Sequence, residues 1–143
     1  RRQADEAGST FDFGRPVEGI LRDAAEKIVA FVISDFGQRI YRIAVAEAES
    51  FPALAEEFYL SGPKLVQDRI AQCLSNATER GELAIDDIPF AAAQFAQLCK
   101  ADLHDRMIFA PKSGCSAADA ARVIDGTIDM FMARYRAQPI AAT

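Results

Sequence analysis

The chain has 143 residues, a length that fits one domain with a full hydrophobic core. Half of the residues are apolar, tryptophan is absent, and the formal net charge of −5 is spread along the chain rather than gathered in blocks. This balance is typical of a soluble helical protein, and an acidic chain without a Lys/Arg stripe is a poor candidate for binding nucleic-acid phosphates itself.

Membrane and secreted proteins are two further classes that the sequence disfavours. The longest apolar runs are far shorter than a membrane span, and the first residues are polar and resemble no signal peptide. The cysteines Cys73, Cys99 and Cys115 are odd in number and form no CxxC motif. We therefore expect reduced thiols in a cytoplasmic protein.

The dominant pattern along the chain is helical, and no segment alternates with period two. We therefore predict an all-α, orthogonal bundle of about five main helices. Residues 1–14 are polar and contain glycine, and we expect them to be a linker or a frayed remnant. Pro16 suits the first turn of a helix. The apolar stripe of that helix comprises Val17, Ile20, Leu21, Ala24, Ile28, Phe31 and Val32.

The second helix is predicted to follow Ser34 or Asp35, since either residue is a suitable N-cap. Pro52 ends this helix and begins a short helical piece over residues 53–60. The stripe that we expect to face inward comprises Phe36, Ile40, Ile43, Ala44, Ala48 and Phe51.

Gly62 and Pro63 break or kink the chain again before the third main helix. A cationic last turn at Arg80, followed by Gly81, predicts the end of that helix. Its apolar positions are Leu65, Val66, Ile70, Cys73, Leu74 and Ala77.

The C-terminal half is predicted to hold two helices. The loop ELAIDDIPF precedes one long helix, which we predict to run from Ile88 to about Phe109. Ser116, with Asp119 three residues later, resembles a capping box that opens the last helix. We expect residues 15–137 to form one helical domain and residues 138–143 to be a disordered tail.

No catalytic motif of the GxGxxG, P-loop, GxSxG or HExxH type is present, so we predict neither an enzyme nor a cofactor. His104 is the single histidine, and Cys99 lies five positions away on the same predicted helix, so their side chains diverge. The spacing of Asp102, His104 and Asp105 splays them too far for a metal site unless a partner supplies ligands. A structural or surface role for His104 is favoured.

Two carboxylates lie among apolar neighbours in the predicted helices. Glu47 shares a stripe with apolar residues and needs a partner. An ion pair or a cap on the helix after Pro52 is favoured over a ligand contact. Asp102 follows Phe95 and Leu98 by seven and four residues, so it is predicted to share their face. It is a partner for Arg106 or a polar group that orients a ligand.

The sequence resembles the C-terminal domain of TetR/AcrR-type bacterial transcriptional regulators, in particular the AefR-like subgroup. The resemblance is carried by AEAESFPALAEEFYLSGP (46–63), RGEL (80–83), DD (86–87), AAAQF (91–95) and ADLH (101–104), in this order. It implies a ligand-receptor and dimerisation domain preceded by a three-helix DNA-binding module. No such module precedes Pro16 in this chain. The chain departs from the family there, and we expect no specific binding of operator DNA without that module.

The resemblance further implies a cavity near the kinked helix that binds a small apolar or amphipathic effector. The residues expected to contact the ligand are Phe31, Tyr41, Phe58, Tyr59, Leu65, Phe95, Leu98 and Asp102. They are mostly large and apolar with a few polar tips. The structural alternative is that each belongs to the ordinary core.

A two-fold homodimer through the last two helices is also expected. The stripe assigned to the partner comprises Ala92, Ala96, Cys99, Leu103 and Met107 on the long helix, with Ala120, Ile124, Ile128, Phe131 and Tyr135 on the last. The alternative is that one of these stripes packs only within the chain, or that the partner and interior stripes are exchanged. The function expected is effector sensing that controls DNA affinity; a repressor is favoured, and the sequence leaves repressor versus activator open. The alternative is a helical protein-interaction domain without a small-molecule ligand.

Overall fold

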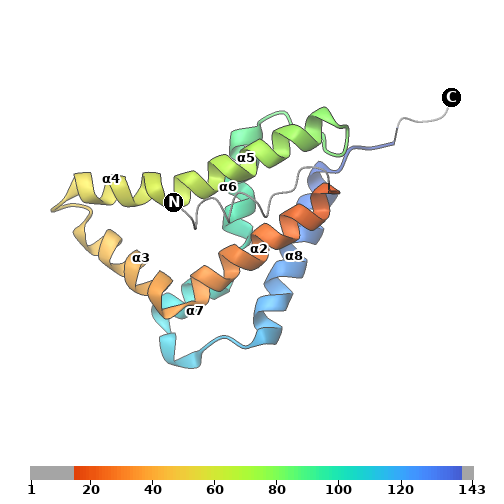
Figure 1. The fold of residues 1–143 in the computed structure, drawn as a ribbon. Coiled ribbons are helices and arrows are strands. Elements are labelled where there is room, and N and C mark those ends of the chain that lie inside the picture. The colour runs from red at the N-terminus through yellow and green to blue at the C-terminus, as the bar shows by residue number, and fades with distance from the viewer. Residues whose placement is uncertain (1–14, 140–143) are drawn as a thin grey trace.

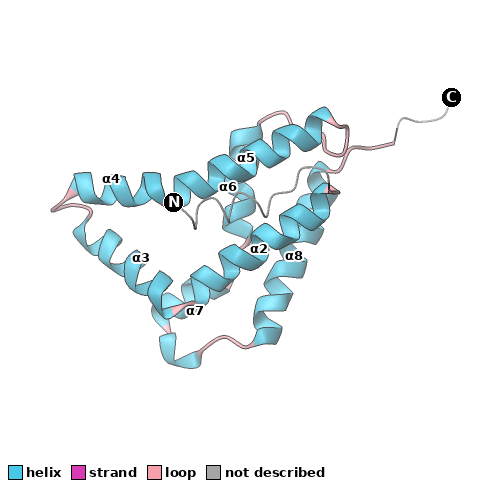
Figure 2. Ribbon diagram, viewed as in Figure 1, coloured by secondary structure: helices cyan, strands magenta, loops and turns pink. Residues whose placement is uncertain are grey.

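The computed structural model describes residues 15–139, so the expectations for residues 1–14 and for the last part of the C-terminal tail lie outside it. The described chain is helical, as predicted (Figure 2). Its elements are α2 (Val17–Ile33), α3 (Asp35–Glu47), α4 (Pro52–Ser61), α5 (Pro63–Glu79), α6 (Ile88–Leu98), α7 (Leu103–Phe109), the 3₁₀ helix η1 (Pro111–Ser113) and α8 (Ala117–Tyr135). The breaks at Pro52 and at Gly62–Pro63 fall where the sequence placed them.

Side-chain caps fix the starts of three helices. The Ser34 hydroxyl accepts a 2.9 Å hydrogen bond from the Gly37 amide at the start of α3. The Asp87 carboxylate accepts a hydrogen bond from the Phe90 amide at the start of α6. At α8 the predicted capping box is complete, because Ser116 and Asp119 each accept from the backbone amide of the other.

The core lies where α2 packs against α8, α5 and α7 (Figure 1). The apolar stripe of α2, except for the exposed Phe31, packs here, and α5, α6, α7 and α8 supply the facing side chains. At the centre the rings of Phe95 and Phe131 meet edge to face, with 5.2 Å between their centroids. The largest fully buried side chains include Ile20, Leu21, Ile70, Leu74, Phe95, Leu103, Ile128 and Phe131.

The segment after α5 joins the two ends of the domain. The Glu82 carboxylate accepts a 3.1 Å hydrogen bond from the Val17 amide in the first turn of α2. The backbone around it also binds the end of α8, through Ala84 N–H to Tyr135 O at 2.8 Å and Ala137 N–H to Glu82 O at 3.1 Å. The helices α2 and α8 are therefore held side by side where α2 begins and α8 ends.

The predicted long helix over residues 88–109 is wrong in one respect, because the structure divides it into α6 and α7. The division lies at Asp102, whose φ of 67° is the one positive value of a non-glycine residue in the described chain. A residue with that φ cannot continue a right-handed helix. The turn redirects α7, so Asp102 does not share a face with Phe95 and Leu98.

The helices α3 and α4 form an arm that extends from the core toward α5 (Figure 1). No residue of α4 is buried, and α3 buries only Gly37 and Gln38. The inward stripe predicted for residues 36–51 is therefore corrected: Phe36 is 67% exposed and Phe51 58% exposed. Ile43 is also exposed, whereas Ile40, Ala44 and Ala48 are partly buried, so the apolar face is only partly covered.

Candidate functional site

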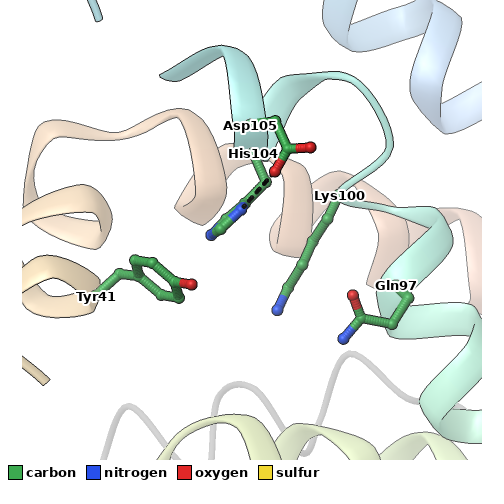
Figure 3. Close-up of a pocket in the computed structure, with 5 residues that line it drawn as sticks. All are labelled: Tyr41, Gln97, Lys100, His104 and Asp105. Carbon is green, nitrogen blue, oxygen red and sulfur yellow. Dashed lines mark ion pairs between the residues drawn. The ribbon is translucent and has the colours of Figure 1, made fainter. Parts of the chain in front are cut away.

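A pocket of about 400 Å³ opens where α3, α6 and α7 meet (Figure 3). Its lining residues are Tyr41 from α3, Gln97 from α6, Lys100 from the turn, and His104 and Asp105 from α7. All of these carry polar atoms, and Tyr41 adds the face of an aromatic ring. The volume is within the usual range for a small-molecule site, roughly 300–1,000 Å³.

The turn between α6 and α7 places the basic side chains of the pocket. After Leu98 the backbone makes tight bonds, with Lys100 N–H to Gln97 O at 3.0 Å and His104 N–H to Lys100 O at 3.0 Å. Lys100 and His104 therefore come to lie on the same side of the turn, and their side chains point into the same space in Figure 3. Asp102, with a φ of 67° and a ψ of −46°, is the central residue of a three-residue turn that the hydrogen bond from Leu103 N–H to Ala101 O closes at 2.7 Å.

His104 forms the wall between α7 and α3. Its imidazole meets the ring of Tyr41 edge to face at a centroid distance of 4.5 Å, and its Nε2 is buried without a hydrogen-bond partner among the described residues. Burial lowers the pKa of His104, and the charge of Lys100 lowers it further. Asp105, with its carboxylate 3.7 Å from Nδ1, opposes this effect. The imidazole is therefore neutral at pH 7.

Lys100 contributes a partly buried ammonium group to the pocket. Burial lowers its pKa, and no carboxylate within the described part of the chain forms an ion pair with it. Lys64, by contrast, forms an ion pair with Asp68 on the surface. An amine that is partly removed from water without a counter-ion is a favourable place for a ligand oxygen.

Arg42, the neighbour of Tyr41, fastens α3 to the far end of α7. Its guanidinium donates hydrogen bonds to the carbonyl oxygens of Ile108 and, at 3.5 Å, Met107. These carbonyls belong to the last turn of α7, where a cation is favourable. The helices α3 and α7 are thus joined at the pocket by Tyr41 and His104 and beyond it by Arg42.

Of the residues predicted to contact a ligand, the structure places Tyr41 in this pocket. Phe95 is instead fully buried in the core, and Asp102 pairs with Arg106 on the surface. The remaining predicted residues lie on α2, α4, α5 and α6 outside the lining: Phe31, Tyr59 and Leu65 are exposed, and Phe58 and Leu98 are partly buried. For these five, contact with a ligand stays a prediction.

Sequence reasoning missed Gln97, Lys100 and Asp105 as members of a site, and it favoured a structural or surface role for His104. The pocket depends on the turn at Asp102, and the prediction of one continuous helix over residues 88–109 did not include this turn. One signal was present: ADLH was part of the resemblance, and aspartate is among the non-glycine residues found more often than most with a positive φ.

The stripe assigned to a dimer partner needs correction. Ala92, Cys99, Leu103, Ile128 and Phe131 are at most 1% exposed in the single chain, and Ala96 and Met107 are 8% and 7% exposed. Their surface is already covered by neighbouring helices, so they are not available to a second copy. The division of the long helix and the packing of α6 on α5 turn this stripe inward. Ala120, Ile124 and Tyr135 remain partly exposed.

Other kinds of site find little support in residues 15–139. No group of three or more His, Cys, Asp or Glu side chains there is placed to hold a metal ion. No helix in this range is long and apolar enough to cross a membrane. A second hollow of about 330 Å³ lies beside the ends of α2 and α8, with Glu18, Asp129 and Arg136 in its rim.

Comparison with known proteins places this fold among bacterial-type regulators. The family model described as the C-terminal domain of AefR-like transcriptional repressors matches residues 19–137. No curated protein matches the chain at a significant level.

Two solved structures resemble it. A proposed TetR-family transcriptional regulator from Mesorhizobium loti MAFF303099 superposes with a TM-score of 0.76 at 24% identity, over 83% of this chain and 59% of that one. The flavonoid-responsive regulator FrrA superposes with a TM-score of 0.76 at 28% identity, over 85% of this chain and 61% of that one. This chain therefore spans less than two thirds of the length of either protein.

Proposed function

Because this chain belongs to the AefR-like C-terminal domain family of TetR-type transcriptional regulators, we propose that it is the effector-binding and dimerisation domain of a bacterial repressor. A small molecule binds in the pocket between α3, α6 and α7 and changes the relative positions of these helices. The change alters the DNA affinity of an N-terminal helix-turn-helix module that is not part of this chain. The domain has no enzymatic role and acts in the cytoplasm.

The observation that carries this proposal is the pocket itself. It is formed by three different helical segments and by one side chain, Tyr41, that sequence reasoning had already assigned to ligand binding. Its other lining groups, Gln97, Lys100, His104 and Asp105, are polar. The ligand is therefore amphipathic rather than purely apolar. FrrA is named as a flavonoid-responsive regulator, so a flavonoid is the first probe to test.

For an effector to act, it must bind one arrangement of the helices more tightly than another. Tyr41 and His104 supply such a connection, because their contact joins α3 to α7 at the pocket wall. A ligand that enters between them changes this contact. From α3 the change passes to the exposed arm formed with α4, which in this proposal faces the DNA-binding module.

The test is a titration of this chain with the flavonoid naringenin, in which the NMR signal of His104 is monitored. With one histidine in the sequence, its imidazole proton signal needs no assignment by mutation. We expect the signal to shift with saturation, and we expect Tyr41→Ala to weaken binding about tenfold. Phe90→Ala, at an exposed ring near the start of α6 and outside the lining, is the matched control. Absence of a shift and of any heat of binding would count against a flavonoid-type effector.

Dimerisation is proposed through a corrected face. On the outer side of α8, Gly126, Met130 and Ala133 follow one another at spacings of four and three and are all exposed. Gly126 has no atom within 4 Å of the place where a Cβ would be, and Met130 is 61% exposed. A stripe of this kind on two copies would be self-complementary across a two-fold axis.

The second candidate is a protein-interaction domain without a small-molecule ligand. It is favoured by the apolar side chains that remain exposed on the arm, among them Phe36, Ile43, Val45 and Leu54, each more than half exposed. Contiguous apolar surface of this kind marks interaction sites. Binding of naringenin at His104 would decide for the sensor, whereas a domain that binds no small molecule would decide for the interaction role.

A further inference from the structure

The charge of the pocket carries information about its ligand. Lys100 has no ion-pair partner among the described residues, and the acid that lines the pocket, Asp105, does not neutralise it. The Asp105 side chain is 87% exposed and its carboxylate pairs with His104, at 3.7 Å from Nδ1 (Figure 3). The ammonium group therefore faces the space between Tyr41 and Gln97 without an opposing carboxylate.

We propose that the effector carries an anionic oxygen group on a planar aromatic body, with Lys100 as the charge partner of that oxygen. This inference rests on the proposed effector site and names the class of ligand that the site takes. A charge-assisted hydrogen bond from an ammonium group to an anionic oxygen is about twice as strong as a neutral one. It also satisfies an amine that burial has partly deprived of water.

Neighbouring groups fit the rest of such a molecule. The Gln97 amide and the Tyr41 hydroxyl point toward the same space as the Lys100 ammonium in Figure 3. The ring of Tyr41 offers an aromatic surface on the α3 side, and its edge-to-face contact with His104 keeps that ring in place. A flat ring system therefore has an apolar wall, while its oxygen lies near Lys100 and Gln97.

The experiment compares two probes of the same shape that differ in charge: 2-naphthoate, which is an anion at pH 7, and 2-naphthamide, which is neutral. Both are titrated into this chain by calorimetry, and binding in the pocket is confirmed by the shift of the His104 signal. We expect naphthoate to bind about tenfold more tightly than naphthamide, a difference of about 1.4 kcal/mol.

Variants at Lys100 assign the preference to its charge. Lys100→Met keeps the length and removes the charge, so the affinity for naphthoate should fall to that for naphthamide, while naphthamide binding changes less than about twofold. Lys100→Arg should retain most of the preference. Lys112→Met, on the exposed 3₁₀ helix η1, is the matched control and should behave as the unaltered chain does.

The outcomes separate this inference from the proposal on which it rests. If both probes shift the His104 signal with equal affinity, the pocket is an effector site but the anionic class is wrong. If naphthoate is preferred and Lys100→Met keeps the preference, another group recognises the anion and the role of Lys100 is wrong. If neither probe binds or shifts His104, the pocket does not take aromatic effectors and both proposals fail.

Discussion

The rings of Tyr41 and His104 meet at 85° with 4.5 Å between their centroids, and the two residues are 63 positions apart in the sequence.

 Sixty-two residues therefore lie between the two rings along the chain, although the rings touch in space. The contact covers Nε2 of His104, which has no hydrogen-bond partner in the described chain. The imidazole at the pocket wall thus reports directly on how α3 sits against α7.

The protonation of His104 gives the first prediction. Burial and the nearby charge of Lys100 lower its pKa, so we expect an NMR titration of the imidazole to give a midpoint below the ordinary value of 6.5. As the pH falls below 6.5, the unfolded chain takes up a proton before the folded one does. The free energy of unfolding therefore decreases over that window and levels off below the folded-state pKa.

His104→Gln is the control for this effect, since glutamine cannot take up the proton. Unfolding in urea at several pH values should show a flatter dependence for this variant between pH 6.5 and the folded-state pKa. A midpoint at or above 6.5 in the unaltered chain would mean that the imidazole is hydrated or paired with Asp105 more strongly than its burial indicates.

Most of the fold could be predicted from the sequence because its helices are marked by local chemistry. Pro16, Pro52 and Pro63 begin helices, and the Ser116 capping box opens α8 as expected. The missed boundary at Asp102 depends on a single backbone conformation that aspartate adopts without a glycine or proline to mark it. The second helix also ends earlier than predicted, at Glu47 rather than at Pro52. Helical periodicity on either side was continuous enough to conceal it.

The site was less predictable, because periodicity shows which residues share a face but not which face is covered. Phe95 and Tyr41 were both assigned to the ligand, yet Phe95 is fully buried and Tyr41 is 37% exposed at the pocket. In the arm, Phe36 and Phe51 have the spacing of core residues but are exposed. Only the relative placement of helices, which no local pattern contains, separates these cases.

The role of Phe95 gives the second prediction. Its ring is fully buried against Phe131 at a centroid distance of 5.2 Å, so we expect Phe95→Ala to lower the free energy of unfolding by about 3–5 kcal/mol. Phe109→Ala, at a side chain that is 83% exposed, should change it by less than about 0.5 kcal/mol. Urea unfolding followed by circular dichroism measures both. A small loss for Phe95→Ala would return this residue to the list of ligand contacts.

The thiols provide a third prediction. Burial raises the pKa of Cys73 to about 11 and that of Cys99 to about 12, and both side chains are buried. Cys115 is only partly buried, although burial and Asp119 raise its pKa as well. Because the thiolate is the reactive form, a disulfide reagent at pH 8 should label Cys115 first and the other two only after unfolding.

Cys115→Ser tests that assignment, because the folded variant should then react slowly while the unfolded variant still offers its two remaining thiols. Mass spectrometry after a short exposure counts the labels. Rapid labelling of Cys99 in the folded chain would show that α6 and α8 separate readily, since Cys99 is fully buried in the structure.

The outer face of α8 gives the last prediction. If it forms the two-fold interface, Met130→Glu places like charges opposite each other and should leave a monomer, whereas Phe109→Glu on α7 should remain a dimer. Sedimentation at several protein concentrations measures the oligomeric state.

Gly126→Ala is a second test of this interface. In a monomer it should stabilise α8 by about 0.5–1 kcal/mol, because nothing lies near the added methyl group. In the dimer the same methyl group would push the paired helices apart, so the variant should weaken association while it stabilises the Met130→Glu monomer. A Met130→Glu variant that stays dimeric would place the interface elsewhere, with the exposed arm of α3 and α4 as the next surface to alter.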